Sequence, residues 1–185
     1  MGTLMETARL RLRPYDKQDA EEIYRVVKRR EIYETTLMIP HPYPREQVEW
    51  WIHFINKNMA YGMSYEFGIF DKVTDRYIGN VGVANLLKKH NSAELAYFID
   101  PDQWGLGYAT EAVRGILNFG FNTLELERIL GRCMACNLAS KRVLEKNRLL
   151  FEGLARHEVM KDGEYKDIVR YAILSADYKR LGLFL

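Results

Sequence analysis

The sequence predicts an α/β protein built on a mixed sheet, and three observations lead to that prediction. Segments that alternate polar and apolar side chains, such as residues 9–13, occur among segments whose apolar side chains recur at helical spacing, such as residues 110–124. The predicted elements follow the order β α α β β β α β α β β, which gives about seven strands and four helices. The chain has 185 residues, of which 48% are apolar and 28% charged, as in ordinary globular proteins. We therefore expect one domain over residues 1–185, with a core from about residue 9 to about residue 175.

The first predicted elements are a strand and two helices. Residues 9–13 form the strand, which ends before a proline. Asp16 is suited to cap a helix that runs to about residue 30, because acidic side chains lie in its first turns and basic ones at its end. Residues 31–44 contain three prolines and no period, so we expect a long connection near a substrate entrance. A second helix is expected over residues 45–58.

The remaining sequence predicts strands interrupted by two further helices. Short polar turns separate the strands, and a closing hairpin turns at residues 161–163. The segment 94–99 carries little charge, as a central strand should. The expected strands are residues 65–70, 76–87, 94–99, 128–136, 149–160 and 164–174, and the expected helices are residues 110–124 and 137–147.

Charge and hydropathy exclude several classes of function. The net charge is +2, from 27 basic and 25 acidic residues, so there is no electrostatic argument for binding nucleic acid or an anionic membrane. The first 13 residues alternate in character and do not form an apolar signal segment. No apolar run approaches the roughly 20 residues of a membrane span. We expect a cytoplasmic protein that binds neither nucleic acid nor membrane.

The two cysteines, Cys133 and Cys136, form a Cys-x-x-Cys sequence that has three possible meanings. A zinc site would need two more ligands, and the four histidines do not have ligand spacing. A redox pair is expected at the start of a helix, whereas these residues fall in a predicted strand. The favoured interpretation is a pair of small strand residues, with no metal.

The segment between the strand at 94–99 and the following helix carries the strongest functional signal. Gly105 and Gly107 stand just before the helix expected from Thr110. Backbone N–H groups at a helix start have no partner inside the helix, the helix dipole adds positive charge there, and glycine lets a ligand approach closely. This combination favours a phosphate or pyrophosphate site. A tight connection without any ligand is the alternative.

Two nucleotide-binding motifs do not account for this turn. A dinucleotide fingerprint needs a third glycine at the position where Thr110 stands. A P-loop needs Gly-Lys followed by Ser or Thr, and the sequence contains no such triplet.

Motifs in a fixed order along nearly the whole chain offer a better explanation. Residues 7–14 have the pattern of an opening strand, and residues 104–112 read Trp-Gly-x-Gly-Tyr-Ala-Thr-Glu-Ala. Residues 137–140 form Asn-x-x-Ser, Lys146 ends the next predicted helix, and residues 152–153 are Glu-Gly. In these stretches the sequence resembles the GNAT superfamily of acetyl-CoA-dependent N-acetyltransferases, and specifically its RimJ/RimL-like branch. The resemblance implies a GNAT-like acyl-CoA N-acyltransferase fold.

The resemblance also implies how acetyl-CoA, the acetyl donor, would be held. The backbone of Phe98 and Ile99 would pair with the pantetheine arm as an additional strand does. Asn137 would hydrogen-bond pantetheine through its side chain. The pyrophosphate would be held by backbone amides, which come from Gly105, Leu106, Gly107, Tyr108, Ala109 and Thr110.

Direct transfer of an acetyl group to an amine needs a base and an acid. Glu94, at the start of its strand, is the first candidate for the base, acting directly or through water. Alternatively, Glu94 is a solvated glutamate at the end of a strand or the partner of a basic residue. Ser140 is the candidate acid for the thiolate, and its alternative role is a helix-start residue that bonds a backbone N–H. Glu158 in the closing hairpin is a weaker candidate for the base.

Two positions depart from the pattern of the branch. Asp102 stands where the superfamily has Gln or Arg, and Gln103 is next to it. Arg148 and Leu149 stand where the branch usually has Gly-Phe after a helix. A helix end prefers glycine because glycine permits left-handed backbone, and Asn147 is the candidate for that role here.

The expected function is therefore N-acetylation of a primary amine, by direct attack in a ternary complex. The resemblance allows either a protein N-terminus or a small molecule as the acceptor, and either a monomer or a homodimer. A non-catalytic CoA-binding module is the alternative from another class, since it would keep the glycine turn without needing the base and the acid.

Overall fold

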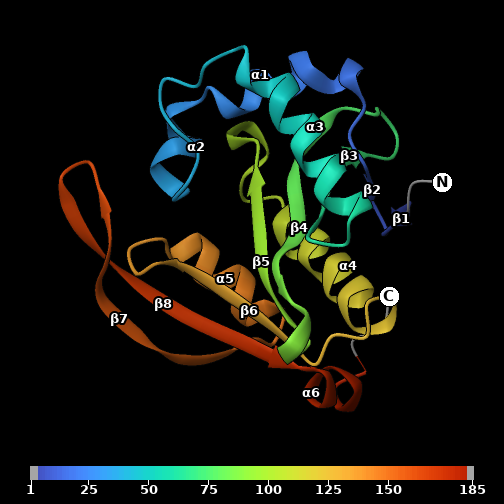
Figure 1. Ribbon diagram of the computed structural model, residues 1–185, viewed down its shortest axis with the longest axis vertical. Helices are drawn as coiled ribbons and strands as arrows, with labels where there is room; N and C mark the ends of the chain where they lie inside the picture. The colour runs from blue at the N-terminus through green and yellow to red at the C-terminus, as the bar shows by residue number, and fades with distance from the viewer. Residues whose placement is uncertain (1–3, 183–185) are drawn as a thin grey trace.

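An eight-stranded mixed sheet runs through the computed structural model, which describes residues 4–182 (Figure 1). The strand order is β1-β2-β3-β4-β5-β6-β8-β7. The strands are β1 (Met5–Glu6), β2 (Leu10–Arg13), β3 (Tyr65–Asp71), β4 (Tyr77–Leu87), β5 (Ser92–Ile99), β6 (Arg128–Met134), β7 (Leu150–Lys161) and β8 (Glu164–Leu174). The α-helices are α1 (Ala20–Val27), α2 (Arg30–Thr35), α3 (Gln47–Ala60), α4 (Tyr108–Asn122), α5 (Leu138–Lys146) and α6 (Ser175–Arg180), with single 3₁₀ turns at Lys17–Asp19, Lys88–His90 and Pro101–Gln103.

The central strands β5 and β6 pair over only part of their length. They are parallel, joined through α4, and their register runs from Ser92↔Arg128 to Leu95↔Gly131. The other neighbouring strands pair antiparallel. Beyond Leu95 and Gly131 the two strands are no longer paired, so a gap opens in the middle of the sheet on the side where β5 leads into α4. The predicted mixed sheet is confirmed.

The two faces of the sheet are covered by different helices. A larger core lies between the sheet and α4, with α5 and α6 at its margin, and it includes Leu12, Val81, Leu95, Ile116 and Ile129. A second core lies under α1, α2 and α3. The helices α1 to α3 and the long hairpin β7–β8 lie on opposite sides of β5 (Figure 1). Apolar residues of α1 recur at helical spacing, and Ala20, Ile23 and Val27 are buried.

Three elements were not expected from the sequence: β1, α2 and α6. The helix α2 is a correction to the long connection predicted at 31–44. Its six residues are too few to show a helical period, and its end is held by the Thr35 and Thr36 hydroxyls, which donate to carbonyls of the preceding turn. The preceding helix ends at Val27 because Arg29 has extended backbone.

The predicted boundaries around the glycine turn and the cysteine pair also need correction. The helix α4 begins at Tyr108, two residues before the expected start, with Gly107 as its N-cap. The strand β6 ends at Met134, so Cys133 is buried on the strand and Cys136 is exposed after it.

The position after α5 differs from the prediction as well. Asn147 has φ of −90°, and it is Arg148 that adopts the left-handed conformation, with φ of 64°. The residue that stands in place of the usual glycine of the branch therefore has the left-handed backbone that glycine permits most easily. Within residues 4–182, no helix combines the length and the apolar character that crossing a bilayer requires.

Candidate active site

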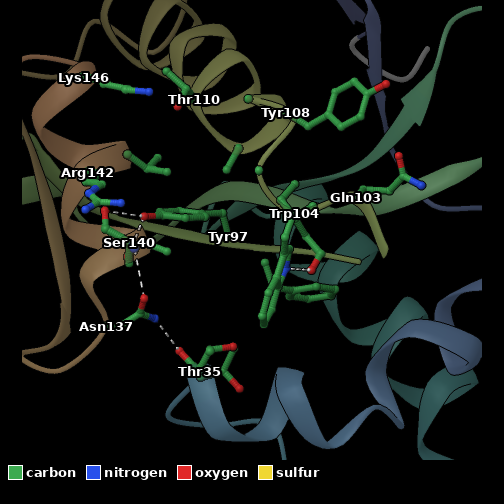
Figure 2. A pocket seen from close by; sticks show the side chains of 18 of the residues that line it. Thr35, Tyr97, Gln103, Trp104, Tyr108, Thr110, Asn137, Ser140, Arg142 and Lys146 are labelled. Atoms are coloured by element: carbon green, nitrogen blue, oxygen red, sulfur yellow. Dashed lines mark hydrogen bonds between the residues drawn. The ribbon is translucent and has the colours of Figure 1, made fainter. Parts of the chain in front are cut away.

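A pocket of about 400 Å³ opens where β5 and β6 part. It lies between the end of β5, the start of α4, one face of α5 and the end of α2 (Figure 2). Nearly all of the residues predicted to bind the cofactor line it. Those residues are Phe98, Ile99, Gly105, Gly107, Tyr108, Ala109, Thr110 and Asn137, and the proposed acid Ser140 lines it too.

The glycine turn presents unpaired backbone donors to this pocket. Gly105 and Gly107 have φ of 79° and 82°, a left-handed conformation that glycine adopts without strain. Within the described chain, no carbonyl accepts from the backbone N–H groups between Gly105 and Thr110. These donors stand at the positive end of the 15-residue helix α4. The turn can therefore bind an anion through backbone alone.

An anchor behind the turn holds it in place. Arg9 Nη1 donates to the carbonyl of Leu106 at 3.0 Å, and Arg9 Nε donates to Glu111 Oε2 at 2.7 Å. Burial alone would raise the pKa of Glu111, but hydrogen bonds from Thr7 and Arg9 outweigh burial and lower it. Leu106 itself is exposed and does not line the pocket, so its contribution is limited to its backbone.

Two cations from α5 also line the pocket, and their role was not expected from the sequence. Lys146 extends toward Thr110 at the start of α4 and Arg142 lies beside Ser140 (Figure 2), and in residues 4–182 neither has an ion-pair partner. With Ala139 and Val143 they line the pocket at helical spacing. This i, i+3, i+4, i+7 pattern is the signal that could have identified them.

Ser140 is part of a half-buried hydroxyl pair. Its Oγ lies 2.6 Å from the hydroxyl oxygen of Tyr97 on β5. Burial raises the pKa of Tyr97, and the hydrogen bond with Ser140 offsets only part of that effect. Burial also raises the pKa of the neighbouring Cys133 thiol. The pair therefore carries protons at neutral pH and lies beside the gap between β5 and β6.

Asn137 connects the pocket to α2. Its Oδ1 accepts from the backbone N–H of Ser140 at 3.0 Å, which caps α5. Its Nδ2 donates to the carbonyl of Thr35 at 3.3 Å, across the pocket (Figure 2). One hydrogen of this amide remains for a ligand. The end of α2 is also held by Lys161 of the β7–β8 hairpin, whose Nζ donates to the carbonyls of Tyr33 and Thr36.

Glu94 does not line the pocket. Its carboxylate accepts from Arg132 Nε at 2.5 Å and from Asn85 Nδ2 at 3.1 Å. Arg132 also donates to Glu158 Oε1 at 3.4 Å, and Arg170 donates to the same oxygen at 3.0 Å. The two carboxylates considered as bases therefore share one arginine. The second oxygen of Glu158, Oε2, is buried and has no partner in the described chain.

This ion network lies on the face of the sheet opposite α4. Side chains alternate along β5, and Ala93 and Leu95, the neighbours of Glu94, pack into the core under α4. On β6, Arg132 alternates in the same way with Cys133, which is part of that core. In the described residues, no group of three or more His, Cys, Asp or Glu side chains is arranged to hold a metal ion.

Comparison with known proteins identifies the family. The family described as "Acetyltransferase (GNAT) domain" matches residues 9–149. The Bacillus subtilis (strain 168) protein named "Uncharacterized N-acetyltransferase YoaA" is 31% identical over 180 residues, which cover 94% of this chain and 98% of that protein. "Probable N-acetyltransferase YjcK" from the same organism is 40% identical over 114 residues, or 61% of this chain and 63% of that protein.

A solved structure shows the same fold. The structure titled "RimL- Ribosomal L7/L12 alpha-N-protein acetyltransferase in complex with Coenzyme A" superposes with a TM-score of 0.85 at 16% identity, over 93% of this chain and 98% of that one.

The family match covers most of the chain, and the match to YoaA covers nearly all of it. This chain therefore belongs to the GNAT acetyltransferase family and is an acetyltransferase.

Proposed function

We propose that the chain transfers an acetyl group from acetyl-CoA to a primary amine, by direct attack in a ternary complex. One observation carries this proposal: unpaired amides from Gly105 to Thr110, at the start of α4, face a pocket between two strands that part. The pocket is about 400 Å³, and its two cations, Arg142 and Lys146, suit a diphosphate. The donor set therefore fits CoA, which supplies the acetyl group as a thioester.

Different residues of the pocket would bind different parts of CoA. Backbone N–H groups of the turn would bind the pyrophosphate, with Arg142 and Lys146 adding charge. Phe98 and Ile99 would offer backbone to the pantetheine arm along the unpaired end of β5. The carbonyl oxygen of Ile99 already accepts a hydrogen bond from the Trp104 indole N–H at 2.7 Å, so it has one acceptor position left for the pantetheine arm. Asn137 would give its remaining amide hydrogen.

Transfer would then need two proton movements by this chain. We propose that Glu94, directly or through water, takes the proton that the attacking amine loses as the new C–N bond forms. Ser140 would donate its proton to the sulfur as the C–S bond breaks, and the hydroxyl of Tyr97, 2.6 Å away, would support that donation. A positioned base or acid typically contributes about 10²–10⁴-fold. Glu158, with its free oxygen, is the second candidate for the base.

Relatives suggest which amines to test. The neighbour titled RimL is named for acting on the α-amine of ribosomal protein L7/L12. Another neighbour, a chimera, is named as a spermidine N-acetyltransferase, with a TM-score of 0.80. We propose a protein N-terminus or a small-molecule amine as the acceptor.

The test combines CoA binding with acceptor-dependent release of thiol. The probes are acetyl-CoA with hexapeptides that begin with Ser, Ala or Asp, and with spermidine. We expect micromolar CoA binding by calorimetry, and thiol release that depends on at least one amine. CoA binding without thiol release in the presence of any of these amines would favour a CoA-binding module. The absence of CoA binding would refute the proposal.

A further inference from the structure

We propose that the carboxylate of Glu66 on β3 receives the ammonium group of the acceptor and so selects cationic amines; the bound ammonium then releases one proton to water before the neutral amine attacks, and Glu94 takes the second proton as the C–N bond forms. This inference rests on the proposed transfer reaction, and it adds the group that binds the second substrate.

Glu66 lies in line with the gap between β5 and β6. It pairs with Gly82 of β4, and Gly82 pairs with Ala96 of β5. Paired residues of neighbouring strands point to the same face, and the strands are about 4.8 Å apart. Ala96 directly follows the last residue of β5 that pairs with β6, and it is two residues from Glu94 on the same face. Glu66 is therefore two strands from the gap, on the face of the proposed base.

The side chain of Glu66 leans toward that gap. A Cβ atom built on Gly82 would lie 2.7 Å from Glu66 Cγ, so the glutamate occupies the space above this glycine. Asn80 Nδ2 donates to Glu66 Oε2 at 3.1 Å, and the Tyr15 hydroxyl holds Asn80 by donating to its Oδ1 at 2.7 Å. The two residues in line between Glu66 and the gap, Gly82 and Ala96, are small.

Glu66 differs from the other carboxylates of this face in having no cation beside it. Glu94 is bonded to Arg132, and Glu158 to Arg132 and Arg170. Glu66 is half-buried, and within residues 4–182 its carboxylate has one side-chain donor, the neutral amide of Asn80. A partly buried charge without a partner is costly, so such groups cluster at functional sites. An incoming ammonium would supply the missing positive charge.

The ionisation of Glu66 fits this role. Burial raises its pKa, and the hydrogen bond from Asn80 offsets part of that rise. The ionisable group that interacts with Glu66 is Tyr15, from the loop after β2, whose hydroxyl oxygen lies 3.4 Å from the hydroxyl oxygen of Tyr77 on β4. Since protonated Glu66 carries no charge, amine binding should weaken as the pH falls through its raised pKa.

The test separates amine binding from chemistry by comparing two variants. Steady-state kinetics at saturating acetyl-CoA use the best amine among spermidine and the Ser-, Ala- and Asp-initiated hexapeptides. We expect Glu66→Gln to raise the KM of the amine by about 30–100-fold with a small change in kcat, while Glu94→Gln lowers kcat. Glu66→Asp should recover part of the affinity. Glu152→Gln, which removes a surface carboxylate paired with Arg128, is the matched control.

Three further readouts decide the outcome. CoA affinity by calorimetry should be the same for Glu66→Gln and the wild type. The KM of the amine should rise at acid pH in the wild type and lose that dependence in Glu66→Gln. An unchanged KM for the amine in Glu66→Gln would overturn this inference and leave the transfer reaction standing. A wild type that neither binds CoA nor releases thiol would instead refute the proposed function, and this inference with it.

Discussion

The two faces of the sheet around β5 carry functional groups that come from different parts of the chain. On the α4 face, the pocket is made mainly from two short contiguous segments, the turn leading into α4 and one face of α5, and its anion donors are largely backbone N–H groups. On the opposite face, the charged groups are single side chains from five strands, Glu66, Glu94, Arg132, Glu158 and Arg170. The first site is held by local backbone geometry, and the second by tertiary pairing. Substitutions should therefore separate cofactor binding from amine chemistry.

The largest effect is expected at the backbone of the anion site. Gly107→Val forces a β-branched residue into φ of 82°, which distorts the turn and its free amides. We expect CoA affinity, measured by calorimetry, to fall by about 100-fold or more, since charge-assisted hydrogen bonds to phosphate are lost.

Gly163→Val is the control for strain. Gly163 has φ of 77° and open space around it, but it lies at the tip of the β7–β8 hairpin. Both variants should lose similar stability, and Gly163→Val should keep CoA affinity. Equal losses of CoA affinity in the two variants would argue that strain, and not the anion site, explains the result.

The next largest effect is expected for a substitution of Glu94, on the face of the sheet opposite α4. Glu94→Gln keeps the shape of the side chain but removes the proposed base, so kcat should fall by about 10²-fold while CoA affinity stays near that of the wild type. The measurement is thiol release at saturating acetyl-CoA and amine. A kcat equal to that of the wild type would remove Glu94 from the mechanism, and the same experiment on Glu158→Gln would then test the second candidate.

A smaller effect is expected for the cations of α5. Arg142→Ala should weaken CoA binding by about 10-fold at low salt and by less at high salt, because exposed charges are screened. Arg180→Ala in α6 removes a similarly exposed helical arginine away from the pocket, and it should leave CoA affinity unchanged. A loss that does not depend on ionic strength would contradict an electrostatic role for Arg142.

The smallest effect concerns the end of α5. Arg148 is exposed and has φ of 64°, a conformation that glycine adopts at lower cost. Arg148→Gly should therefore raise the free energy of unfolding by about 0.5–1 kcal/mol in urea titrations. Arg156→Gly, on a strand and without positive φ, should be neutral or destabilising. A loss of stability in Arg148→Gly would show that its side-chain contacts matter more than its backbone.

The contrast between the faces also explains what the sequence could predict. The glycine turn, Asn137 and Ser140 were recognisable because the residues that form the pocket are neighbours in sequence, and periodicity located the long helices. The helix α2 was missed because six residues show no period, and Arg142 and Lys146 were missed because exposed charges on a helix usually mean a solvated face. The pairing of Glu94 with Arg132 and the position of Glu66 over Gly82 depend on strand register, which no local pattern encodes.

We propose that CoA binds to the backbone of the turn between Gly105 and Thr110, on one side of the sheet, and leaves the other side to the amine. Titration of ¹⁵N-labelled protein with CoA tests it directly, with amide shifts as the readout. We predict the largest shift changes at the amides from Gly105 to Thr110 and at Ser140, and small ones at Glu66, Glu158 and Arg170. CoA that binds while the amides from Gly105 to Thr110 keep their shifts would contradict the account.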